Sequence, residues 1–249
     1  IEGKVPFLNF FDGFRTSHEY QKIEKWDYAD LKEMCNMEAV EEFRKKALNP
    51  ENPKMRGSHE NGDVFFQHRE ACNSVYNALP AVVEKYMAKI NAKLGTNYDL
   101  FNYYGAPDAE HVIISMGSVN DTIEETIDYL VAQGRKVGVV KVRLYRPFCA
   151  QALIDAIPDS VKQITVLDRT KEPGALGEPL YLDVVASLKD SKFGGVKVFS
   201  GRYGLGSKDT TPAQIVAVYE NTAKEKFTIG IVDDVTNLSL ETGAPIVTT

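Results

Sequence analysis

The chain has 249 residues, of which 43% are apolar and 26% are charged, a balance typical of a soluble globular protein. Its formal net charge of −6 argues against broad binding to nucleic acid or to an anionic membrane, and no apolar run reaches the roughly 20 residues of a membrane helix. Three widely spaced cysteines (Cys35, Cys72 and Cys149) argue against a disulfide framework, a zinc site or an iron–sulfur cluster, and they favour a reducing, cytoplasmic setting.

The first 48 residues show little apolar periodicity. Val5–Phe11 resembles a strand, and a polar, helix-prone stretch follows from about Tyr20 to Leu48. That stretch is too poor in apolar residues to form a core alone, so we expect it to pack on another part of the protein. Residues 49–62 combine prolines, glycines and asparagines, which indicates a linker. Because a strand-like run follows the opening Ile-Glu-Gly-Lys almost at once, we interpret the chain as an excised domain or a proteolytic fragment.

Strands and helices alternate regularly from about residue 104, after a predicted helix at Pro80–Leu94 that has Pro80 in its first turn and Gly95 at its end. A last helix should begin at a capping box formed by Thr211 and Gln214, and residues 227–231 can add a strand. The elements predicted between them are strand Val112–Met116, helix Asp121–Gln133, strand Val137–Val142, helix Phe148–Ile157, strand Val161–Leu167, helix Pro179–Leu188 and strand Val196–Phe199.

This alternation predicts an α/β protein with three layers, α/β/α, around a mainly parallel open sheet, and with a helical N-terminal extension. We assign residues 1–48 to the end of a preceding domain and residues 49–99 to a linker and helix. Residues 100–225 should form the α/β domain, and residues 226–249 a tail that leads towards the next domain.

Four loops are expected at the carboxyl edge of this sheet, where open α/β proteins usually meet ligands or partner domains. They are residues 117–120, 143–147, 168–178 and 201–209. Glycines that let the backbone approach a ligand, together with helix N-termini, make a phosphate or pyrophosphate site one hypothesis for this edge. The cationic side chains of the loops are Arg143, Arg146, Arg169, Lys171, Arg202 and Lys208.

The same loops also carry carboxylates, so that six cations face four anions. A remaining charge of +2 is weak for a polyanion site and natural for a domain interface with ion pairs. Gly201–Gly206 lacks the spacing of the dinucleotide fingerprint, and the chain has no Walker motif. We therefore favour the interface, and the anion site stays open as a second hypothesis. The carboxylates are Asp168, Glu172, Glu178 and Asp209.

No group of residues in the sequence indicates catalysis or metal binding. The four histidines have no metal-ligand spacing. His18 is explained by helix capping through Thr16 or Ser17, and His111, just before a strand, is expected to be peripheral. Ser118 lacks the G-x-S-x-G turn of a serine nucleophile. We predict no catalytic residue and no metal ligand.

Six motifs, in order along nearly the whole chain, closely resemble those of the pyruvate:ferredoxin (flavodoxin) oxidoreductases. Any one of them is only suggestive, whereas the ordered series is highly specific. The motifs are FFDGFRTSHE at 10–19, YGAPDAE at 104–110, MGS at 116–118, KVRLYRPF at 141–148, LDRTKEPGA at 167–175 and GRYGLGSKD at 201–209.

The resemblance implies that residues 1–48 end the first, thiamine-diphosphate-associated domain of a much longer polypeptide. Residues 100–225 would then be its second domain, which is similar to the C-terminal domain of transketolase-like enzymes. The family oxidatively decarboxylates pyruvate with coenzyme A to acetyl-coenzyme A and carbon dioxide, and iron–sulfur clusters pass the electrons to ferredoxin or flavodoxin. Thiamine diphosphate, magnesium, iron–sulfur clusters and a homodimer are implied for the parent.

The family's substrate-side residues, its diphosphate- and magnesium-binding domain and its cysteine-rich cluster domain are absent from this sequence. We therefore expect the fragment to hold no cofactor and to be inactive alone. Our first hypothesis is a non-catalytic scaffold that contacts other domains or a second subunit through the loop edge. The alternatives are a coenzyme A- or phosphate-binding module built on the loop cations, and the C-terminal domain of another thiamine-diphosphate enzyme.

Overall fold

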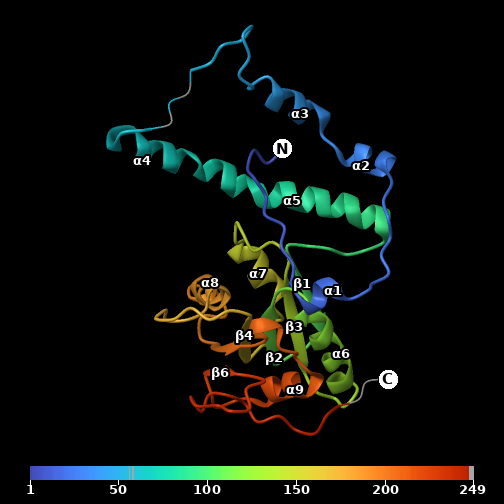
Figure 1. Cartoon of the computed structure of the whole chain (residues 1–249). Helices are drawn as coiled ribbons and strands as arrows, with labels where there is room; N and C mark the ends of the chain where they lie inside the picture. Colours follow the sequence, from blue (N-terminus) through green and yellow to red (C-terminus); the bar gives the residue numbers. More distant parts are fainter. Residues whose placement is uncertain (56, 58, 247–249) are drawn as a thin grey trace. The chain divides into compact units, whose positions relative to one another are not determined.

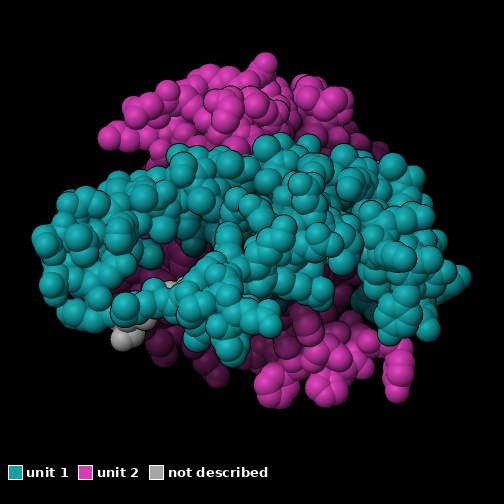
Figure 2. Space-filling view, turned by 90° about the horizontal axis from the view of Figure 1, so that it is seen from above, with its two compact units in different colours: residues 1–9, 21–99 teal, residues 10–20, 100–249 magenta. Residues whose placement is uncertain are grey.

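The computed structural model describes residues 1–246 apart from 56 and 58. Two positions of the predicted linker, 56 and 58, and the last three of the predicted tail therefore lie outside the described residues. The chain forms two compact units, which Figure 2 shows in different colours. Unit 1 comprises Ile1–Asn9 and Gln21–Asp99, and unit 2 comprises Phe10–Tyr20 and Leu100–Thr249.

Unit 2 is built on one six-stranded sheet with the strand order β1-β3-β2-β4-β5-β6 (Figure 1). All neighbouring pairs are parallel except β1 and β3, which are antiparallel. The predicted mainly parallel open sheet is therefore confirmed. The strands are β1 Phe101–Gly105, β2 His111–Ser115, β3 Val137–Val142, β4 Gln163–Asp168, β5 Lys197–Arg202 and β6 Lys226–Thr228.

Helices cover both faces of this sheet, which confirms the three-layer fold. Helix α6 (Val119–Val131) packs with α9 (Pro212–Glu220) on one face, and α7 (Ala150–Ala156) packs with α8 (Pro179–Leu188) on the other (Figure 1). The α9 start is the predicted capping box, because the Thr211 and Gln214 side chains accept each other's backbone N–H groups.

The core between the sheet and the α6–α9 layer consists of side chains that the apolar pattern placed inward. Large side chains from the strands also belong to this core. Among them, Phe199 is 1% exposed and Phe227 is 0% exposed. Close packing of this kind leaves little room for added volume. The helix residues of this core include Ile123, Ile127, Leu130, Ile215 and Val218.

Unit 1 consists of helices without a substantial core of their own. They are α2 (Tyr28–Met34), α3 (Met37–Arg44), α4 (Gly62–Ala71) and α5 (Asn73–Leu94). Among the described residues of this unit, Leu79 is the only buried hydrophobic side chain. This agrees with the low apolar periodicity of the first 48 residues. In the described residues, no helix has the length and apolar character needed to cross a membrane.

Two expectations for the N-terminal half are wrong. Val5–Phe11 forms no strand, because in the described residues its backbone pairs with none of the strands of the sheet. Helix α5 begins at Asn73, so that Pro80 lies inside the helix instead of in its first turn, and Gly95 ends it in the left-handed conformation as expected. An interior proline leaves the carbonyl one turn earlier without its helical partner.

Candidate functional site

The four predicted loops meet at one edge of the unit 2 sheet. Strands β2, β3, β4 and β5 are parallel, so their carboxyl ends lie side by side and the following loops emerge together. The loop cations do not form one cluster there. Instead, most of them contact carboxylates of the same unit.

Arg169 binds a carboxylate from a segment far away in the sequence. Its Nη1 lies 3.0 Å from Asp12 Oδ1, and its Nε donates a hydrogen bond to the Gly204 carbonyl at 2.9 Å. The other Asp12 oxygen accepts the Ser118 N–H at 2.8 Å. Burial raises the pKa of Asp12, but the Ser118 hydrogen bond and the Arg169 charge outweigh burial and hold this pKa below its ordinary value.

Two glycines make this contact possible. Gly117 has φ +86°, and a Cβ atom there would lie 3.1 Å from Asp12 Oδ2. Gly204 has φ +63°, and a Cβ atom would lie 3.1 Å from Arg169 Nε. Both positions therefore favour glycine for their backbone conformation and for the close approach. We call Gly117, Ser118, Arg169 and Gly204 the carboxylate site.

A second carboxylate, Glu178, holds two more of the loop cations. Its side chain is 3% exposed and accepts the Glu172 N–H at 2.7 Å. Its Oε1 lies 3.4 Å from Arg202 Nη1 and 3.9 Å from Lys171 Nζ. The hydrogen bonds and ion pairs of Glu178 therefore fold the 168–178 loop over the end of β5.

Replacing Glu178 with glutamine should lower the free energy of unfolding by about 1–2 kcal/mol, because the amide keeps an acceptor for Glu172 but leaves Arg202 without a counter-charge. Urea unfolding followed by far-UV circular dichroism measures the loss. The matched control is Glu172→Gln, which keeps the Glu172 backbone N–H in place. Equal losses in the two variants would contradict a special role for the Glu178 charge.

Asp168 is the last residue of β4, and its side chain stabilises the start of α8. Its carboxylate accepts the backbone N–H groups of Leu180 and Tyr181, at 3.0 and 3.1 Å, and so caps the start of α8. Burial raises the pKa of Asp168 to about 6, against the effect of these two hydrogen bonds. Counting Asp168 among the anions that face the loop cations was therefore wrong.

The three remaining cations lie apart from the carboxylate site. Arg146 stacks on the Tyr145 ring and lies 2.8 Å from Asp183 Oδ2 of α8. Arg143 donates from Nε to Asn102 Oδ1 of β1 at 2.6 Å. Lys208 is exposed, and its ammonium group has no partner among the described residues. The structure thus brings Lys171 and Arg202 together but distributes the other predicted residues over separate contacts.

A shallow pocket of about 430 Å³ adjoins the carboxylate site. It is lined by residues 12–14, 169–171 and 204–207. In the described residues, no group of three or more histidine, cysteine, aspartate or glutamate side chains is arranged to hold a metal ion. The chemistry that this edge offers is recognition of a carboxylate.

Three residues have roles that the sequence analysis missed. Asp12 belongs to the motif at 10–19, and its position next to a glycine in an aromatic segment gives no local sign of its partner. His111 is not peripheral: it lies in β2, with Nδ1 3.1 Å from the Tyr219 carbonyl and Nε2 2.8 Å from the Thr165 hydroxyl. Ser17 does not cap a helix, because it lies inside α1 (Arg15–His18) and its hydroxyl donates to the Phe14 carbonyl.

Two family models match the chain. The first, described as pyruvate flavodoxin/ferredoxin oxidoreductase, thiamine diP-binding, matches residues 1–88, and the second, pyruvate:ferredoxin oxidoreductase core domain II, matches residues 109–215. A pyruvate-flavodoxin oxidoreductase of Enterobacter agglomerans is 56% identical over 244 residues, which are 96% of this chain. The chain belongs to the pyruvate:ferredoxin/flavodoxin oxidoreductase family. The resemblance drawn from the six motifs is therefore confirmed.

Other members of the family are similar over the same extent. The pyruvate:ferredoxin oxidoreductase of Moorella thermoacetica is 52% identical over 97% of this chain. The chain spans 21% of the length of this relative and of the Enterobacter one. A pyruvate dehydrogenase [NADP(+)] of Cryptosporidium parvum is 49% identical over 96% of the chain, which spans 13% of it.

A solved structure of the 2-oxoglutarate:ferredoxin oxidoreductase from Magnetococcus marinus was also matched. It is 19% identical with a TM-score of 0.42, and the match covers 68% of this chain and 24% of that one.

Proposed function

We propose that the chain is a non-catalytic scaffold within a pyruvate:ferredoxin or flavodoxin oxidoreductase. In this proposal it joins the thiamine-associated part of a longer polypeptide to the domain that unit 2 forms. The Enterobacter and Moorella relatives, of which the chain spans 21%, support a longer parent. The boundaries at residues 48, 99 and 225 remain part of the proposal.

One observation carries the proposal: the carboxylate site binds Asp12. This residue lies in the region matched by the thiamine-binding model, whereas Gly117, Ser118, Arg169 and Gly204 lie in the region matched by the core domain II model. The loop edge thus recognises a carboxylate, and that carboxylate comes from a neighbouring region of the same chain. A docking surface requires a contact with another region of the protein, whereas a site for a free phosphate would require cations without such a partner.

The parent would oxidise pyruvate with coenzyme A in the cytoplasm, act as a homodimer and reduce ferredoxin or flavodoxin. It would carry thiamine diphosphate, magnesium and iron–sulfur clusters. We propose that the residues of this chain hold none of these cofactors and that their part is to position the domains. Positioning matters because small displacements of reacting groups reduce turnover strongly.

Replacing Arg169 or Arg202 with alanine in the full-length polypeptide should impair assembly and lower pyruvate-dependent acetyl-coenzyme A formation, about 10-fold or more, because misplaced domains lose catalytic geometry. Light scattering and turnover measure the two effects. Lys208→Ala is the matched control, since this exposed lysine has no partner among the described residues. Variants of Arg169 and Arg202 that assemble and turn over normally would contradict the proposal.

A coenzyme A- or phosphate-binding module remains the second candidate. The observation in its favour is the shallow pocket, which Lys171 lines and which the glycine-rich residues 204–207 border close to Lys208. Titration calorimetry of the 249-residue chain with coenzyme A at low salt tests it. The scaffold predicts no heat at about millimolar ligand, whereas binding at micromolar concentration would favour the module.

A further inference from the structure

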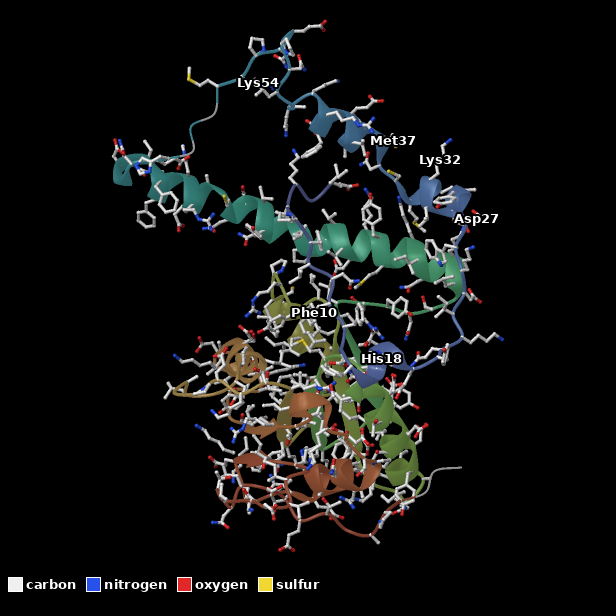
Figure 3. The ribbon with its side chains drawn as sticks, in the orientation of Figure 1. Phe10, His18, Asp27, Lys32, Met37 and Lys54 are labelled. Carbon is white, nitrogen blue, oxygen red and sulfur yellow. The ribbon has the colours of Figure 1, made fainter. Side chains whose placement is uncertain are left out.

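Residues 10–20 belong to unit 2, although residues of unit 1 precede and follow them in the chain, and we call them the strap. Phe10 and His18, labelled in Figure 3, lie near its two ends. The aromatic side chains of the strap do not anchor it, since Phe10, Phe11 and Phe14 are 61%, 74% and 79% exposed. An apolar segment that leaves its rings in solvent gains little from burial. Its position must depend on polar contacts.

The backbone of the strap is strained where it turns. Phe14 has φ 53° and ψ −111°, a conformation that a residue with a side chain rarely adopts. Strain of this kind persists only where surrounding contacts impose it. The turn is held locally by the Phe14 carbonyl, which accepts the Ser17 hydroxyl at 2.8 Å and the His18 N–H at 3.1 Å. Asp12, two residues before Phe14, supplies the contact with the rest of unit 2.

The carboxylate site is built to receive an anion of this size. The Ser118 N–H lies at the start of α6, where backbone donors have no partner within the helix. Arg169 adds a positive charge, and its side chain is 24% exposed. Removing the carboxylate would leave the Ser118 N–H and Arg169 Nη1 without their acceptor in a partly buried position, which is costly.

We propose that Asp12 is the positioning residue of the strap: its carboxylate, bound in the carboxylate site, holds residues 10–20 on the rest of unit 2 as a latch. The inference rests on the proposed scaffold function and names the contact that performs it. The site takes a carboxylate as its ligand, and a small free carboxylate should enter it when Asp12 is removed.

Hydrogen exchange of the 249-residue chain, read by mass spectrometry, tests the latch. In Asp12→Ala, the His18 amide and its neighbours in the strap should exchange about 10-fold faster or more, and the Ser118 amide should also lose protection. In Asp12→Asn, the exchange rates of these amides should lie between those of the unsubstituted chain and of Asp12→Ala, because asparagine keeps an acceptor and loses the charge. Asp27→Ala is the matched control, since Asp27 also accepts a backbone N–H but caps α2 in unit 1. Exchange of β4 reports that unit 2 remains folded.

Acetate then separates the site from the latch. About 0.5 M acetate should restore the protection of Ser118 in Asp12→Ala, while sodium chloride at equal ionic strength should not. Acetate should not slow the exchange of the strap amides, since free acetate is not tethered to the strap. The acetate effect should disappear in Asp12→Ala/Arg169→Ala.

Unchanged strap exchange in Asp12→Ala would overturn the latch, and equal effects of acetate and chloride would overturn the carboxylate site. Failure of the scaffold function looks different, because it appears as normal assembly and turnover of Arg169 variants in the full-length polypeptide.

Discussion

Replacing Gly201 with valine should lower the free energy of unfolding of unit 2 by about 3 kcal/mol, because strand β5 has no space for a side chain at this position. A Cβ atom there would lie 2.5 Å from Phe227 Cζ and 2.6 Å from Leu167 Cδ2. Both neighbours are almost fully buried, so neither can move without disturbing the core. Urea unfolding followed by far-UV circular dichroism is the suitable measurement, since the single tryptophan, Trp26, lies in unit 1.

Gly206→Ala is the matched control in the same motif. Gly206 has φ +65°, and nothing lies within 4 Å of an added Cβ atom, so only backbone strain of about 1 kcal/mol is expected. A larger loss at Gly206 than at Gly201 would contradict the packing argument. The comparison also tests the view of the 201–209 motif as a set of ligand-binding glycines, because that view predicts little loss of stability at Gly201.

Periodicity predicted the fold well wherever burial was the dominant force. Helix α8 has the predicted bounds, Pro179–Leu188, and strands β2 to β5 begin within two residues of the predicted positions, although β5 continues three residues beyond its predicted end. Strand β1 was missed because its sequence, Phe-Asn-Tyr-Tyr-Gly, shows no apolar alternation. Its formation depends on antiparallel pairing with β3, a long-range contact that no local pattern encodes.

The site was predicted in part. Topology alone places four loops at one edge, and the sequence shows which cations they carry. It does not show their partners, because Asp12 reaches Arg169 from 157 positions earlier in the chain. The burial of Glu178 and the capping role of Asp168 likewise depend on how the 168–178 loop folds over β5. Charge counting favoured an interface, and the family models then identified the region that supplies Asp12.

Two groups of unit 2, the partly buried His111 and the buried Asp168, should give opposite pH dependences of stability. Burial lowers the pKa of His111 to about 4, so the folded state stays neutral where the unfolded state takes up a proton. Its contribution is present above pH 6.5 and is lost as the pH falls towards 4, by about 3 kcal/mol in total. Burial raises the pKa of Asp168 to about 6, so the folded state takes up that proton first. Its contribution, again about 3 kcal/mol, is present below pH 4 and is lost as the pH rises through 6.

The two slopes should nearly cancel in the unsubstituted chain, and single substitutions should reveal them. In His111→Gln, the free energy of unfolding should rise by up to about 3 kcal/mol as the pH falls from 6.5 to 4, because only the Asp168 term remains. In Asp168→Asn it should fall by a similar amount over the same range. Each change is measured against the value of the same variant at pH 7, which removes the cost of the substitution itself.

The double variant His111→Gln/Asp168→Asn is the control, and its stability should again vary little between pH 4 and 6.5. Asp12 contributes little in this range, since its pKa lies below the ordinary value and its stabilisation is lost only at lower pH. Parallel pH profiles of the two single variants would contradict the lowered pKa of His111 and the raised pKa of Asp168. Opposite slopes would instead show that the folded state binds the Asp168 proton and excludes the His111 proton, at opposite ends of strands β4 and β2.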